Sequence, residues 1–171
     1  IRKLMERAVP EGTPVEEIDR VHETFTAHYK VHCADKTRPY DGIMELLQNL
    51  KKDGCKLAVV SNKADYGVQE LCKQYFDGVF DFAVGEREGI RKKPAPDSVN
   101  EVLKTLECSR DRAVYIGDSD VAQVRLITAA NAQMDHIIVE WGFRDIPFLI
   151  SKGAKVLVEK PEEILEIVEG R

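Results

Sequence analysis

The sequence predicts an α/β fold, in which a Rossmann-like, mostly parallel sheet carries helices on both faces, with a smaller helical segment before it. From Tyr40 onward, short apolar runs alternate with segments whose apolar residues recur every three to four positions. This alternation is typical of parallel strands joined by right-handed crossovers. In addition, the apolar run 113–117 stops directly before Asp118 and Asp120. Polar residues at the carboxyl end of a strand occupy the position where such sheets bind ligands.

The N-terminal part of the sequence has a helical pattern and lacks the alternation of strands and helices that begins at Tyr40. Thr13, Pro14 and Glu16 have the spacing of a capping box with a proline in the first turn, so we expect a helix over 13–33. The polar stretch 34–39 then resembles a linker. We therefore predict two domains, a helical appendage at 1–38 and a core domain at 39–171.

Histidines occur at two positions of this helix that share one face. His28 and His32 are four residues apart, which is the spacing of a metal-binding pair. Because no further Glu or Cys ligand pattern accompanies them, the sequence favours surface or partly packed histidines.

In the core domain, strands and helices follow one another in a regular order. Gly54 stands where a left-handed residue ends a helix, and Ser98 with Glu101 has the spacing of a second capping box. The apolar periods predict strands at 57–60, 80–84, 113–117, 136–140 and 155–158, and helices at 42–53, 63–76, 97–106, from about 120 to 132, and 161–168.

Composition and charge narrow the function classes. The 171 residues carry a net charge of -5 with scattered basic residues, which argues against a nucleic-acid surface, and no apolar run reaches membrane-spanning length. The cysteines have no CxxC spacing, so we expect reduced thiols in a cytoplasmic protein rather than a zinc site or a disulfide framework. They are Cys33, Cys55, Cys72 and Cys108.

Three separate strand ends offer polar groups to one edge of the predicted sheet. Ser61 and Asn62 follow the first strand, Lys93 lies in a basic loop after the second, and Asp118 and Asp120 follow the third. A hydroxyl and a lysine can bind phosphoryl oxygens, and carboxylates can hold Mg²⁺, which is the set that phosphoryl transfer requires. Taken singly, the same residues suit a plain turn, a solvated loop lysine and a helix cap.

The order of these motifs resembles the haloacid dehalogenase superfamily, and within it the phosphoglycolate phosphatase-like members with a helical cap. The segments that carry the resemblance are Val59-Val60-Ser61-Asn62-Lys63, Arg91-Lys92-Lys93-Pro94-Ala95-Pro96-Asp97, Tyr115-Ile116-Gly117-Asp118-Ser119-Asp120-Val121 and Trp141-Gly142-Phe143-Arg144.

The resemblance implies a Mg²⁺-dependent phosphatase that hydrolyses a small phosphorylated metabolite through an aspartyl-phosphate. It implies that Ser61 and Lys93 are catalytic and that these two residues and Asn62 contact the substrate. It also implies that Asp118 and Asp120 bind the metal, that 1–38 is a partial helical cap, and that 39–171 is a core domain without its first strand. The Lys-Pro-x-Pro-Asp pattern selects Lys93 rather than Lys92 as the motif lysine.

Two departures from the family pattern bear on activity. The nucleophile motif Asp-x-Asp-Gly-Thr is absent before Val59, and Ala122 stands where the pattern usually has an acidic residue. We therefore expect this chain to be inactive as it stands, with weakened Mg²⁺ binding. Since Ile1 lies inside an amphipathic pattern, we also expect that a preceding segment has been removed or was never included.

Two expectations follow from the absent motif. The alternative function is a catalytically inactive phosphate-binding or interaction module. In the family, the strand bearing the nucleophile lies between the strands equivalent to 57–60 and 113–117. Because unpaired buried backbone groups are costly, we expect either that these two strands pair directly in parallel or that another segment, such as a strand from a second copy, fills the gap. We favour direct pairing, which needs no partner.

Overall fold

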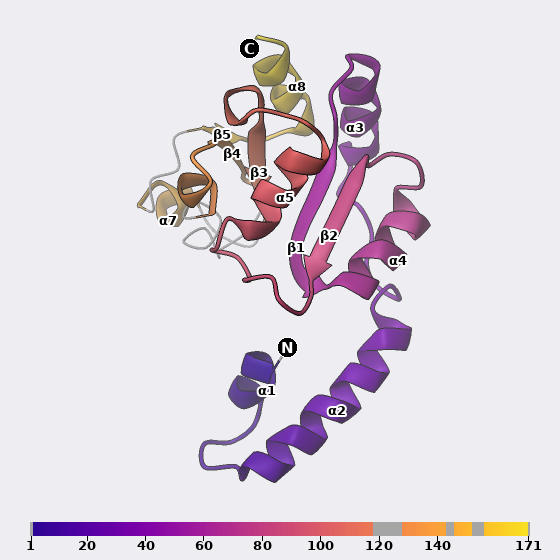
Figure 1. Cartoon of the computed structure of the whole chain (residues 1–171), viewed down its shortest axis with the longest axis vertical. Helices are drawn as coiled ribbons and strands as arrows, with labels where there is room; N and C mark the ends of the chain where they lie inside the picture. Colours follow the sequence, from indigo (N-terminus) through magenta and orange to yellow (C-terminus); the bar gives the residue numbers. More distant parts are fainter. Residues whose placement is uncertain (1, 118–127, 143–145, 152–155, 171) are drawn as a thin grey trace. The chain divides into compact units, whose positions relative to one another are not determined.

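The fold was analysed in a computed structural model, which describes residues 2–117, 128–142, 146–151 and 156–170. The chain divides into two compact units, Ile1–Arg38 and Pro39–Arg171, and each is described here by itself (Figure 1). None of the helices in the described part of the chain combines the length and apolar composition that crossing a membrane requires.

The first unit consists of two helices, α1 (Arg2–Ala8) and α2 (Val15–His32). The predicted capping box at the start of α2 is wrong. Pro14 occupies the N-cap position, and the hydroxyl of Thr13 donates a hydrogen bond to the carbonyl of Pro10 at 2.7 Å. That hydroxyl stabilises the preceding turn instead of the helix, because the turn carbonyl offers it a closer partner. The interpretation of this unit as part of a cap stays a prediction.

The second unit alternates strands and helices, as the sequence predicts. Several boundaries differ, and β1 continues through Ser61 and Asn62 instead of stopping before them. The elements are α3 (Ile43–Lys52), β1 (Ala58–Ala64), α4 (Asp65–Tyr75), β2 (Phe82–Glu86), α5 (Asp97–Thr105), η1 (Arg110–Arg112), β3 (Val114–Gly117), β4 (Asp135–Val139), α7 (Ile146–Ser151), β5 (Leu157–Val158) and α8 (Pro161–Glu169).

The described strands form two parallel sheets. In one sheet β1 pairs with β2, and Val59 lies opposite Ala83. In the other the order is β3-β4-β5, and Ile116 lies opposite Ile137. The predicted parallel α/β architecture is confirmed. The predicted direct pairing of β1 with β3 is wrong, because the two strands belong to different sheets.

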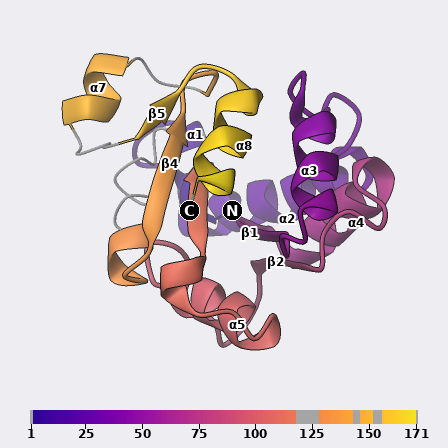
Figure 2. The same ribbon diagram turned by 90° about the horizontal axis from the view of Figure 1, so that it is seen from above.

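Helices on two sides hold these sheets together (Figure 2). On one side, α5 buries Val99 and Leu103 in a cluster that also includes Val60 of β1 and Tyr115 of β3. On the other side, α3 and α8 enclose a larger apolar cluster with β4 and β5. Because α5 packs across both strands, burial of its apolar side chains fixes the two sheets without a backbone ladder between them.

The end of α3 follows the sequence prediction. Gly54 has a φ of +81°, and its amide donates to the carbonyl of Lys51 at 3.0 Å. The amide of Cys55 donates to the carbonyl of Leu50 at 2.9 Å, which completes a Schellman motif. A side chain other than glycine is strained at this φ, so Gly54 ends the helix for a local reason.

The start of α5 differs from the prediction. No side-chain cap forms there, and the proposed box between Ser98 and Glu101 is wrong. The Glu101 carboxylate pairs with Arg87 instead. Charge-assisted hydrogen bonds are stronger than a neutral contact with a backbone amide, and the preceding loop supplies the arginine.

The ends of β1 and β2 approach each other closely at Gly85. A Cβ atom there would lie 2.5 Å from the carbonyl oxygen of Lys63 and 2.6 Å from the Cα of Asp65. The amide of Gly85 donates to the Asp65 carboxylate at 2.7 Å. Because the obstructing atoms are backbone, only glycine fits between these two segments.

Asp81 ties the beginning of β2 to neighbouring elements. Its carboxylate accepts a hydrogen bond from the amide of Leu57 at 2.7 Å and another from Lys51 Nζ at 3.0 Å. The Leu57 amide contributes most and the Lys51 ammonium adds to it, and together they hold the pKa of Asp81 below its usual value of 3.8.

We expect Gly85→Ala to lower the free energy of unfolding by about 1–3 kcal/mol, because the backbone must move to admit the methyl group. Urea denaturation measures the change. Gly67→Ala is the matched control: this position lies in α4, and its Cβ would meet only the flexible Lys63 side chain at 3.4 Å. The control should raise stability by about 1 kcal/mol through helix propensity. Equal effects of the two substitutions would contradict the close approach at Gly85.

We expect Asp81→Asn to reduce the dependence of stability on pH. Since the folded-state pKa is lowered, the ionised carboxylate stabilises the fold above the unfolded-state pKa, and this contribution is lost as the pH falls through the folded value. Urea unfolding between pH 6 and pH 3 should therefore show a shallower decline for Asp81→Asn than for the unsubstituted chain. The exposed Asp77 provides the control substitution Asp77→Asn. A decline as steep as that of the unsubstituted chain would refute the assignment.

Candidate functional site

The C-terminal part of β1 carries the first predicted site residues. Ser61 is partly buried, and its Oγ accepts a hydrogen bond from the amide of Lys63 at 3.1 Å. Asn62 is exposed and binds the backbone of Lys93: its Oδ1 accepts from the Lys93 amide at 3.0 Å, and its Nδ2 donates to the Lys93 carbonyl at 3.3 Å. One asparagine side chain thus attaches the loop after β2 to the end of β1.

Lys93 is buried, with 8% of its surface exposed. Its Nζ donates to the carbonyl of Val60 in β1 at 2.9 Å and lies 3.5 Å from the hydroxyl oxygen of Tyr115 in β3. The ammonium group is therefore located between the two sheets, directly before Ser61 in the strand. The structure brings Ser61, Asn62 and Lys93 to the same end of β1.

The other basic residues of this loop have different surroundings. Arg91 forms two hydrogen bonds with the Asp97 carboxylate, at 2.8 and 3.0 Å. Lys92 pairs with Glu86, and 53% of the Lys92 side chain remains exposed. These ion pairs connect the loop to Glu86 at the end of β2 and to Asp97 at the start of α5. They also distinguish the exposed Lys92 from the buried Lys93, in agreement with the choice that the motif pattern makes.

The predicted metal ligands Asp118 and Asp120 lie outside the described residues, and so does Ala122. The described part of β3 ends at Gly117, two residues after Tyr115. Because Tyr115 lies beside Lys93, the chain leaves β3 near the end of β1. The assignment of the two aspartates to Mg²⁺ stays a prediction.

Sequence reasoning missed two residues that shape this region. The sequence places Tyr115 in an apolar strand and at the start of a motif segment without a role of its own, yet its hydroxyl lies 3.5 Å from the Lys93 Nζ. The side chain of Asn131 donates to the carbonyl of Pro94 at 2.9 Å and supports the same loop from a distant helical segment. Neither contact has a sequence signal, because each partner is more than 20 positions away.

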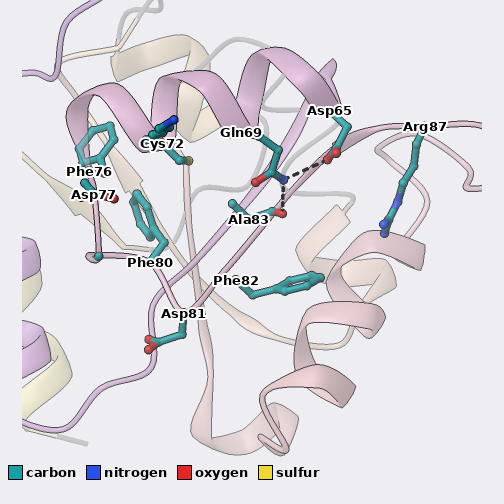
Figure 3. Close-up of a pocket in the computed structure, with 12 residues that line it drawn as sticks. Asp65, Gln69, Cys72, Phe76, Asp77, Phe80, Asp81, Phe82, Ala83 and Arg87 are labelled. Atoms are coloured by element: carbon teal, nitrogen blue, oxygen red, sulfur yellow. Dashed lines mark hydrogen bonds between the residues drawn. The ribbon is translucent and has the colours of Figure 1, made fainter.

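A separate pocket of about 470 Å³ lies along α4 and β2 (Figure 3). Phe76, Phe80, Phe82 and Cys72 are among its lining residues, whereas Ser61, Asn62 and Lys93 are not. Burial raises the pKa of the Cys72 thiol, which keeps it protonated and poorly nucleophilic. The pocket and the predicted phosphate-binding residues are therefore different places.

We expect Asn62→Ala to lower the free energy of unfolding by about 1–2 kcal/mol, because both hydrogen bonds to the Lys93 backbone are lost. Asn62→Asp should be at least as damaging, since it sets a carboxylate oxygen against the Lys93 carbonyl. Urea denaturation measures both. Asn49→Ala on α3 removes only a contact with Lys52 at 3.3 Å and should change stability by less than about 0.5 kcal/mol. If all three variants behave alike, Asn62 does not hold the loop.

Comparison with known proteins identifies phosphatases as relatives of this chain. A phosphoglycolate phosphatase from Aquifex aeolicus is 35% identical over 125 residues, which cover 70% of this chain and 55% of the relative. An N-acetylmuramic acid 6-phosphate phosphatase from Pseudomonas aeruginosa is 27% identical and is matched over 90% of this chain and 67% of its own length. This chain thus spans little more than half of the Aquifex protein.

A solved structure shows the same fold. The crystal structure of a candidate phosphoglycolate phosphatase from Lactobacillus delbrueckii subsp. bulgaricus superposes with a TM-score of 0.86 and 48% identity. The match covers 94% of this chain and 66% of that one. In addition, the family model of haloacid dehalogenase-like hydrolases matches residues 2–139. With this match over most of its length, and with the parallel fold and the motif residues described above, the chain belongs to the haloacid dehalogenase-like hydrolases.

Proposed function

We propose that the protein is a Mg²⁺-dependent phosphatase that hydrolyses a small, phosphoglycolate-like phosphate monoester. The reaction proceeds through an aspartyl-phosphate, and its nucleophilic aspartate comes from a segment that these 171 residues do not contain. A cytoplasmic location is proposed with it, supported by four cysteines that are free thiols. The family membership supports the reaction class, while the residues at the end of β1 support the chemistry.

The buried Lys93 is the observation that carries the proposal. Burying an ammonium group is costly unless polar or anionic groups compensate its charge. Asn62 holds the Lys93 backbone by two hydrogen bonds, so the cation is fixed in place before any ligand arrives. A preorganised charge of this kind stabilises a phosphoryl group without reorganisation during the reaction.

Each of the site residues has its own role in the proposed reaction. The hydroxyl of Ser61 donates a hydrogen bond to a phosphoryl oxygen and orients the group, and the ammonium of Lys93 neutralises negative charge on it. Asn62 contacts the substrate and keeps the lysine loop against β1. Asp118 and Asp120 offer the oxygen ligands that Mg²⁺ prefers, and the metal supplies charge neutralisation at the phosphoryl oxygens when bound.

Ser61 and Lys93 are suited to phosphate monoesters that differ in their alcohol group. The relatives named above act on phosphoglycolate and on N-acetylmuramic acid 6-phosphate, and both compounds are small phosphate monoesters. Ser61 and Lys93 address the phosphoryl group that such compounds share. The alternative function, an inactive phosphate-binding module, would retain these contacts without hydrolysis.

We expect the 171-residue chain to release no phosphate from an aryl phosphate in the presence of Mg²⁺, because it holds no Asp-x-Asp-Gly-Thr nucleophile. A fusion that adds the nucleophile-bearing N-terminal strand of a close relative should hydrolyse it. In that fusion, Lys93→Met should lower kcat by about 10²–10³-fold. Lys92→Met is the matched control and should leave kcat nearly unchanged.

Two outcomes would contradict the proposal. Turnover by the unfused chain that survives stringent purification and is abolished by Asp118→Asn would require a nucleophile other than the one proposed. A fusion that binds inorganic phosphate in a Lys93-dependent manner, yet hydrolyses none of a panel of phosphate monoesters, would favour the inactive binding module.

A further inference from the structure

The side chain of Tyr115 contacts the proposed catalytic lysine from the second sheet. Its hydroxyl oxygen lies 3.5 Å from Nζ of Lys93, and the same ammonium donates to the carbonyl of Val60 at 2.9 Å. A lysine ammonium can only donate hydrogen bonds, so both oxygens act as acceptors. Because β1 and β3 belong to different sheets, the ammonium has an acceptor in each sheet.

Packing against α5 holds the phenol ring of Tyr115 in place. Tyr115 and Val60 both pack against the buried cluster to which α5 contributes Val99 and Leu103. The loop that carries Lys93 leads directly into the same helix. One helix thus sets the position of the lysine loop and of both acceptors, and side chains that are locked by packing hold a site to the precision that chemistry requires.

The number of acceptors around the ammonium decides how well Lys93 is oriented. A lysine side chain has a flexible four-carbon stem, and its ammonium carries three donors. Acceptors in two sheets restrict the directions of two donors and therefore the direction of the third. Removing one acceptor widens the range of positions that Nζ can occupy. A displacement of about 1 Å at a catalytic group can cost about 100-fold in rate.

The length of the contact is in keeping with a role during binding. The distance of 3.5 Å between Nζ of Lys93 and the Tyr115 oxygen exceeds the usual length of about 2.7–3.2 Å for such hydrogen bonds. Hydrogen bonds at catalytic groups are often long in the unliganded protein and tighten when the substrate binds. The Tyr115 hydroxyl is therefore placed to restrain Lys93 most strongly in the liganded state.

We propose that Tyr115 is a positioning residue for Lys93, whose ammonium its hydroxyl orients toward the phosphoryl group of the substrate. This role rests on the phosphatase function proposed above. Tyr115 acts through Lys93 and does not itself contact the substrate. A purely structural role would reside in the packing of the aromatic ring, which phenylalanine reproduces. The substitution Tyr115→Phe therefore removes the orienting oxygen and keeps the packing.

The first test measures the contact in the whole chain and needs no turnover. Lys93 is buried, so NMR of its ¹⁵N-labelled ammonium reports how fast the ammonium protons exchange with water. In Tyr115→Phe this exchange should be at least about threefold faster, because one acceptor is lost. Tyr75→Phe is the matched control, since Tyr75 is also partly buried and lies at the end of α4. The control should leave the exchange rate unchanged.

The second test uses the fusion that carries the nucleophile-bearing strand. Tyr115→Phe should lower kcat for an aryl phosphate by about tenfold and change KM by less than about twofold, because orientation of the ammonium matters most in the transition state. In a Lys93→Met background the same substitution should lower kcat by less than about twofold, since residues that act through one another are not additive. Tyr75→Phe should leave kcat and KM unchanged.

The outcomes separate this role from the proposed function. If the fusion hydrolyses no phosphate monoester, the proposed function is wrong, and the exchange of the Lys93 ammonium protons still decides whether Tyr115 orients the lysine. The positioning role is overturned if these protons exchange equally fast in Tyr115→Phe and in the unsubstituted chain. It is also overturned if an active fusion keeps its full kcat in Tyr115→Phe, or if the loss is as large in the Lys93→Met background.

Discussion

The buried Lys93 ammonium connects two parallel sheets that share no backbone ladder in the described part of the chain. Its contacts include the carbonyl of Val60 in β1 and the hydroxyl of Tyr115 in β3. Because the donor is charged, its hydrogen bond to the Val60 carbonyl is stronger than a neutral one and stabilises β1 at this point. The loop that carries Lys93 is in turn held by Asn62 and Asn131. The residue proposed to meet a phosphoryl group therefore also stabilises the strand end.

This coupling explains why the site can be recognised without a ligand. The other basic side chains of the loop form ion pairs near the surface, with the carboxylates of Glu101, Asp97 and Glu86. Lys93 differs from them by burial, and burial of a fixed charge is what favours binding of an anion there. Because the contacts proposed for Ser61 and Lys93 are with a phosphoryl group, they specify the reaction more strongly than the alcohol of the substrate. The relatives illustrate this, since they act on different phosphate monoesters.

The sequence by itself determined the order of the elements, the parallel α/β architecture, the end of α3 at Gly54 and the choice of Lys93 over Lys92. These follow from apolar periodicity, from glycine at a positive φ and from a short motif, all of which act over a few neighbouring residues. The tertiary structure decided which partners the polar side chains take. Glu101 pairs with Arg87 instead of capping α5, and Tyr115 reaches Lys93. It also decided that β1 and β3 stay in separate sheets, because the packing of α5 across both strands depends on contacts between segments far apart in the chain.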